Sequence, residues 1–159
     1  MHGGVPAFKL AWPQHAGVFT PQTRSYADVS LGRNATWDLD INIGAAKADL
    51  DLSNLDVRSL GLDVGATDAK ITLGDPSDET RATIKAGASS IVLMVPEGIG
   101  VEFNSKSALT SVDIADESDW TRTGEIGNRT WRTSGFVDAS RRIYVTCQAG
   151  AASVEVKKY

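Results

Sequence analysis

A Gly-Ala dipeptide returns along this chain at a nearly constant interval, and this repeat strongly limits the possible folds. Its glycines are Gly44, Gly65, Gly87 and Gly150, which follow one another after 21, 22 and 63 residues. The last interval is three times 21. A fixed period of this size is typical of stacked structural repeats.

Apolar and polar residues alternate on both sides of each glycine. Around Gly44 the apolar positions are Leu39, Ile41 and Ile43 before it and Ala48, Leu50 and Leu52 after it. Such alternation places one set of side chains on one face of a strand. Each repeat is therefore predicted to be a strand, a tight corner and a second strand. Stacking of these units pairs the backbone of each repeat with the next and buries the shared apolar face.

The predicted fold is all-β, a right-handed β-solenoid of short two-strand rungs with a period of about 21 residues. An ordinary β-sandwich is the alternative that alternation alone would allow. The four glycines are expected to be structural corners stacked in a column, because glycine tolerates positive φ and lets another backbone approach closely. A fifth rung fits if Ala108 takes the corner position, with Phe103 before it and Val112 and Ile114 after it. The segment 121–135 is expected to be an irregular rung or an excursion.

The chain divides into two parts by pattern. Residues 1–36 are predicted to be an N-terminal lead-in and cap over the first rung, and residues 37–159 to be the solenoid, with a final strand pair at 143–159. The first few residues resemble a non-native leader, so we expect a natural N-terminal extension that is missing here. The sequence has no apolar run of about 18 residues, so no membrane span is predicted within it.

The net charge and the cysteine content limit the partners and the covalent cross-links that this chain can have. The net charge of −4 argues against nucleic acid as a partner. Cys147 is the only cysteine, which rules out an intrachain disulfide. It lies in the inward register and is expected to be a small buried hydrophobe.

No residue pattern predicts catalysis, a cofactor or a metal. The two histidines, His2 and His15, have no partners for a triad or a zinc site. The acidic residues of segment 113–119 do not have the spacing of a calcium loop and are expected to be solvated. The carboxylates at 75–79 are interpreted in the same way. We therefore expect a protein that is not an enzyme and binds no cofactor.

Two tryptophans and two arginines form the candidate interaction surface: Trp120, Arg122, Trp131 and Arg132. Exposed Trp beside Arg is typical of an interaction hot spot. Alternatively, the indoles pack over the solenoid as a lid, and this second interpretation is favoured.

The corner repeat, followed by Val95-Pro96-Glu97-Gly98, resembles the toast-rack family of bacterial β-solenoids, including the C-terminal domain of LiaF-like, cell-wall-active antibiotic response proteins. The segments 127–136 and 143–156 are also similar to such domains. The resemblance covers about residues 37–159 and does not reach the lead-in.

This resemblance implies a bacterial cell-envelope module, membrane-associated through the missing N-terminal sequence, on an unspecified side of the membrane. It implies a protein partner in envelope-stress sensing or regulation, either a membrane sensor or a second copy of the chain. Two alternatives stay open: a carbohydrate-binding or carbohydrate-active β-helix, and an architectural self-assembling module.

Overall fold

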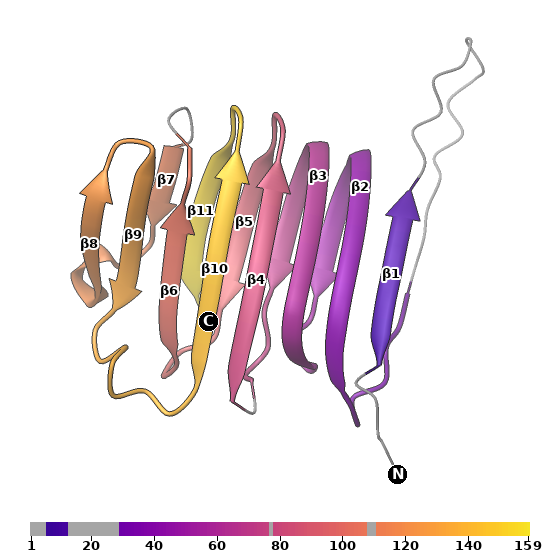
Figure 1. The fold of residues 1–159 in the computed structure, drawn as a ribbon, viewed down its shortest axis with the longest axis horizontal. Coiled ribbons are helices and arrows are strands. Elements are labelled where there is room, and N and C mark those ends of the chain that lie inside the picture. The colour runs from indigo at the N-terminus through magenta and orange to yellow at the C-terminus, as the bar shows by residue number, and fades with distance from the viewer. Residues whose placement is uncertain (1–5, 13–28, 77, 108–110) are drawn as a thin grey trace.

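The computed structural model describes residues 6–12, 29–76, 78–107 and 111–159, and it is all-β, as predicted (Figure 1). The described residues contain no α-helix, only one short 3-10 turn, η1 (Glu117–Asp119). The strands are β1 (Ala7–Trp12), β2 (Thr36–Asp51), β3 (Asp56–Thr72), β4 (Glu79–Ala86), β5 (Ser90–Val95), β6 (Gly100–Ser105), β7 (Ser111–Ile114), β8 (Trp120–Glu125), β9 (Asn128–Thr133), β10 (Arg142–Ala149) and β11 (Ser153–Lys158).

The strands form two layers that face each other across an apolar core. The front layer, nearest the viewer in Figure 1, holds β1, the first halves of β2 and β3, and then β4, β10, β6, β9 and β8. The back layer holds the second halves of β2 and β3, and then β5, β11 and β7. β2 and β3 pass through their corners without a break and so belong to both layers. Where the corner is described, at Gly44, Gly65, Gly87 and Gly150, one front strand leads into one back strand, and we call each such pair of strands a rung; the layers are not closed into a barrel. The right-handed solenoid stays a prediction.

The rungs do not stack in sequence order. The last strand pair, β10/β11, lies between the rung β4/β5 and the rung β6/β7. Val145 of β10 is opposite Ala82 on one side and Phe103 on the other, and β11 pairs with β5 and β7 in the same way. The interval of 63 residues thus separates direct neighbours in the stack, and the strand pair predicted at 143–159 is the last in the chain but not the last in the stack. Every rung presents a similar inward face, so the chain can leave the stack after β7 and return to an earlier position.

Three of the corners, at Gly65, Gly87 and Gly150, lie directly against the corner of the neighbouring rung in the stack. A Cβ built on Gly65 would be 2.5 Å from the carbonyl oxygen of Gly44, and one on Gly87 would be 2.9 Å from that of Gly65. The nitrogen of Gly150 donates to the oxygen of Ala86 at 2.9 Å. Gly65, Gly87 and Gly150 do not have positive φ. Close approach of backbones, and not positive φ, is therefore what requires glycine here.

The fifth predicted rung is β6/β7, whose register matches the prediction. Phe103 is opposite Val145, Val112 is opposite Val154, and Ile114 is opposite Val156. Its proposed corner, Ala108, lies outside the described residues. Segment 121–135 is the expected excursion: β8 and β9 form an antiparallel hairpin that joins the front layer beside β6.

At the other end, β1 pairs in parallel with the first half of β2, so this part of the lead-in covers the front edge of the first rung. Between the layers, the core consists mainly of aliphatic side chains, together with Phe103, Trp120 and Trp131. Cys147 is buried among them, as predicted.

Candidate interaction surface

The predicted surface residues of the β8/β9 hairpin lie on two different faces. Trp131 is 3% exposed, and its ring centroid lies 5.8 Å from that of Phe103 in the core. The register places Arg122 opposite Trp131 on the inward face, where it is nevertheless exposed. Arg132, the next residue along β9, projects from the outer face. The four residues therefore do not form one continuous surface.

Trp120 begins β8 and is also buried, with 9% exposure. The ammonium group of Lys158 lies 5.7 Å from its ring centroid and 2.8 Å from a carboxylate oxygen of Asp119. The indole nitrogen of Trp120 has no hydrogen-bond partner among the residues that the structure describes. Both tryptophans of the hairpin thus extend the core, in keeping with the lid interpretation.

A second group of side chains lies together on the outer face of the front layer, and we call it the Arg-aromatic band. Its members are Arg81 on β4, Arg132 on β9, Phe136 in the β9–β10 connection, and Arg142 and Tyr144 on β10. Arg81 is opposite Tyr144, Tyr144 is opposite Glu102, and Glu102 is opposite Arg132. Pairing of four neighbouring strands therefore brings together residues that are more than 50 positions apart in sequence.

The rings and guanidinium groups of the band are in contact. The guanidinium carbon of Arg81 lies 4.9 Å from the ring centroid of Tyr144, and the ring of Phe136 meets Tyr144 edge-on at 5.6 Å. Arg132 and Arg142 lie 5.6 Å and 5.8 Å from the centroid of Phe136. Cation–π contacts of this kind contribute about 0.5–1 kcal/mol at exposed sites. Both rings are half-buried, so each keeps one part in contact with water.

Hydrogen bonds and ion pairs hold the arginines in place. Arg142 donates to the carbonyl oxygens of Phe136 and Val137 at 3.2 and 2.8 Å, which fixes the connection to β10. Arg132 pairs with Glu102 at 2.6 Å. Arg81 pairs with Glu79, also at 2.6 Å. Such exposed pairs add little stability, but they restrict the directions in which the guanidinium groups can turn.

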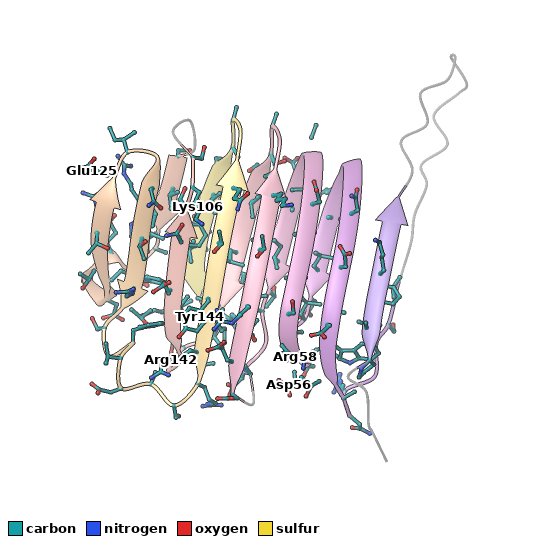
Figure 2. All side chains as sticks on the ribbon, viewed as in Figure 1. Asp56, Arg58, Lys106, Glu125, Arg142 and Tyr144 are labelled. Atoms are coloured by element: carbon teal, nitrogen blue, oxygen red, sulfur yellow. The ribbon has the colours of Figure 1, made fainter. Side chains whose placement is uncertain are left out.

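A β-bulge extends the charged surface toward β2. The register shifts between Trp37 and Asp38, which leaves Arg58 and Ser59 as consecutive exposed residues on β3. Bulges re-aim side chains in this way. Arg58 bonds Asp38, and this hydrogen bond, followed by the charge of Asp38, raises the pKa of Arg58. Beside it lies a hollow of about 410 Å³, lined by residues that include Asp56, Arg58 and Arg81. Figure 2 labels Asp56, Arg58, Tyr144 and Arg142, all in the lower part of this view.

The sequence reasoning missed Arg81, Tyr144 and Phe136, although part of the signal was present. The position six residues before each corner faces outward on the front layer. In the order of the strands this position is held by Asp38, Ser59, Arg81, Tyr144 and Glu102. Reading down this column would have found most of the band. Phe136 has no such signal because it lies in a connection.

Carboxylates of both acidic segments considered for metal binding form ion pairs. His2 and His15 lie outside the described residues. Asp75 pairs with Arg141, and Asp119 pairs with Lys158. Among the residues that the structure describes, no group of three or more His, Cys, Asp or Glu side chains could hold a metal ion. Burial raises the pKa of the Cys147 thiol to about 11, which keeps it protonated at neutral pH.

Comparison of the sequence with models of known protein families identifies the family of this chain. Residues 8–94, more than half of the chain, match the family model described as the N-terminal domain of toast_rack. The chain belongs to the toast-rack family. The match begins inside β1, so the toast-rack likeness extends into the lead-in, which the sequence analysis had left outside it.

One solved structure has a similar fold. It is the crystal structure of a proposed cell adhesion protein from Clostridium sporogenes, with a TM-score of 0.73 and 17% sequence identity. The match covers 86% of this toast-rack chain and 68% of the other. No curated protein matches the sequence. Over the described ranges, the toast-rack chain has no helix of the length and apolar character needed to cross a membrane.

Proposed function

We propose that this toast-rack domain is a non-enzymatic protein-interaction module of the bacterial cell envelope. The observation that carries the proposal is the Arg-aromatic band. Arginine and tyrosine are enriched among the residues that dominate protein interfaces. In the band these side chains are held in place on a continuous sheet, so they would lose little conformational freedom when a partner binds.

Two comparisons support the cellular setting of the proposal. The chain belongs to a bacterial family, and a protein of similar fold has been proposed to act in cell adhesion. We further propose that the partner is an envelope protein, either a membrane sensor or a second copy of the chain, and that the interaction serves envelope-stress sensing or regulation as in LiaF-like proteins. Attachment to the membrane would come from sequence that precedes residue 1.

The test compares two charge reversals on opposite faces of the domain. Arg81→Glu changes the band, and Lys70→Glu makes the same change on the exposed outer face of the back layer. Each protein is cross-linked to bacterial membrane fractions, and the captured proteins are quantified by mass spectrometry. Wild type and Lys70→Glu should capture the same envelope protein. Arg81→Glu should capture it about tenfold less well, which corresponds to about 1.4 kcal/mol.

Two outcomes count against the proposal. One is equal capture by all three proteins, because the band would then have no role. The other is reproducible recovery of a soluble cytoplasmic protein in place of any envelope protein.

A carbohydrate ligand is the second candidate, and one feature favours it. Beside the band, five neighbouring front strands present a row of polar side chains in register: Thr83, Thr146, Asn104, Thr130 and Thr123. The amide nitrogen of Asn104 donates to the hydroxyl of Thr130 at 2.8 Å. Neighbouring strands are about 4.8 Å apart, so the row offers hydrogen-bonding groups at regular intervals beside the ring of Tyr144. A glycan array decides: specific binding that Thr146→Val abolishes would favour this candidate over a protein partner.

A further inference from the structure

The two layers do not end together at the hairpin end of the stack. In the front layer, β9 and β8 continue past β6 (Figure 1). In the described part of the chain, no strand of the back layer continues past β7, which pairs with β11 alone. The β8/β9 hairpin therefore overhangs the end of the back layer, where β7 has an open edge. We call this place the overhang site.

The open edge of β7 presents backbone groups that the fold itself does not use. The nitrogens of Ser111 and Ala115 donate to backbone oxygens of β11 at 3.1 and 2.9 Å. Successive residues of a strand direct their hydrogen-bonding groups to opposite sides, so Val112 and Ile114 turn their N–H and C=O groups to the open edge. Unpaired edges of this kind accept an extended segment from another protein.

The exposure of the side chains shows that this end of the core is open. Val112 is half-buried, whereas Val154, at the same position of the next rung, is 1% exposed. Arg122 is exposed although it lies on the inward face of the hairpin, opposite the buried Trp131. In a two-layer protein the opposite layer covers inward side chains. Room for an added strand is therefore left next to β7, behind the hairpin.

The inward face of the hairpin carries positive charge. Arg129 precedes Trp131 by two residues on β9, so it shares the inward face with Arg122. Neither arginine has an ion pair or a side-chain hydrogen bond among the residues that the structure describes. Arg132, on the outer face of the same strand, pairs with Glu102. Two guanidinium groups without carboxylate partners favour a negatively charged occupant of the site.

The spacing of the two arginines suits a single added strand. Arg122 is opposite Trp131 and Arg129 is opposite Gly124, so the two arginines are diagonal neighbours on β8 and β9. The Cβ atoms of diagonal neighbours are about 7–8 Å apart. Alternate residues of a strand point to the same face and are about 6.6–6.8 Å apart. Carboxylates at two alternate positions of one strand can therefore meet both arginines.

The geometry points to β-strand addition at the overhang site. An extended acidic segment of a partner protein pairs with the open edge of β7 and directs alternate carboxylates toward Arg122 and Arg129. The intervening side chains of the segment face outward beside Asp113 and Glu155, which are neighbours on the outer face of the back layer, so these positions are neutral or basic.

A protein partner fits the site better than a second copy of the chain. An isologous contact brings the same residues of two copies together, and here it would place the arginines of one overhang near those of the other. The overhang site is also separate from the Arg-aromatic band, which lies on the outer face of the front layer. The inference therefore does not depend on the proposed function of the band.

The experiment measures binding of a labelled eight-residue peptide to the full chain by fluorescence anisotropy. The peptide consists of valine and threonine with two glutamates placed two residues apart. One control peptide has glutamine in place of glutamate. The other has its glutamates three residues apart, on opposite faces of a strand. The first peptide should bind about tenfold more tightly than the glutamine control and about threefold more tightly than the other, since an exposed ion pair changes affinity by up to about fivefold.

Two variants test the role of the arginines. The double variant Arg122→Gln and Arg129→Gln removes both charges from the inward face of the hairpin. Lys85→Gln is the matched control, because it removes one exposed charge from the outer face of β4. The double variant should bind the glutamate peptide about tenfold less tightly, whereas Lys85→Gln should bind it as wild type does.

Amide hydrogen exchange tests where the peptide pairs. The amides of Val112 and Ile114 face the open edge, so saturating peptide should slow their exchange at least about fivefold. The amide of Ser111 already donates to β11 and should be unchanged. This measurement requires no substitution, so it applies even if a variant fails to fold.

Each outcome bears on the inference. Tighter binding of the glutamate peptide, its loss in the double variant and slowed exchange at Val112 and Ile114 support it. Equal binding of the glutamate and glutamine peptides, binding without slowed exchange, or no binding by the folded wild type overturns it. Light scattering adds one more test. A dimer that Val112→Pro converts to monomer also overturns it, because proline blocks the open edge and a second copy would then be its occupant.

Discussion

The corner column predicts a graded response to one substitution made at three equivalent places. Replacement by alanine adds the same methyl group at Gly65, Gly87 and Gly150. The nearest backbone oxygen would be 2.5, 2.9 and 3.4 Å away, respectively, and in each case it belongs to the corner of the neighbouring rung. Since a carbonyl oxygen of a paired strand cannot turn aside, the two shorter contacts force the rungs apart, whereas the third is relieved by a small shift.

The magnitudes follow from two opposing effects. Alanine restricts the unfolded chain and stabilises the fold by about 0.4–1 kcal/mol where the native φ allows it. Overpacking costs about 1–3 kcal/mol in a closely packed site. Gly65→Ala should therefore lose about 1–3 kcal/mol, Gly87→Ala about 1 kcal/mol, and Gly150→Ala should be within about 0.5 kcal/mol of wild type.

Urea unfolding followed by tryptophan fluorescence measures the three midpoints, and an unchanged m value shows that the change lies in stability. Equal losses at all three positions, or the largest loss at Gly150, would refute the steric account. Such a result would mean that the corner glycines are required for their conformational freedom.

The remaining predictions concern the core and the C-terminus. Trp131→Ala should cost about 3–5 kcal/mol in urea unfolding because it empties a buried site against Phe103, whereas exposed Arg122→Ala should change stability by no more than about 0.5 kcal/mol. Burial raises the pKa of the Cys147 thiol from 9.0 to about 11 in the folded protein. The unfolded chain therefore loses this proton at lower pH than the folded protein does, and the free energy of unfolding falls as the pH rises from 9 to 11. In Cys147→Ala this fall, measured by unfolding at each pH, should be smaller by up to about 2.7 kcal/mol. If the free energy of unfolding of Cys147→Ala falls as much as that of wild type, other titrating groups cause the pH dependence. The hydroxyl of Tyr159 donates to the oxygen of Leu73 at 2.7 Å, so Tyr159→Phe should lower the free energy of unfolding by about 0.5–1.5 kcal/mol, and a larger loss would indicate that the ring has also moved.

Local patterns were sufficient for the rung and its corner. The alternation around Gly44, Gly65, Gly87 and Gly150 indicated which side chains face inward, and this information depends only on the two-residue period of a strand. The same register located β6/β7 from Phe103, Val112 and Ile114. It also predicted that Cys147 is buried. The two tryptophans of the hairpin were harder, because Trp120 and Trp131 lie outside the repeat and their burial depends on contacts with β6 and with Lys158.

Sequence by itself determined the unit of this protein: a front strand, a corner without a side chain and a back strand with one apolar face. Only the tertiary structure decided the order of the units, because every rung offers its neighbours nearly the same backbone edge and the same inward side chains. Nothing local to residues 142–158 distinguishes a place at the end of the stack from a place between β4 and β6. That choice depends on the β8/β9 hairpin and on the connection that returns past Gly100, and it also decides which arginines and rings meet on the front layer.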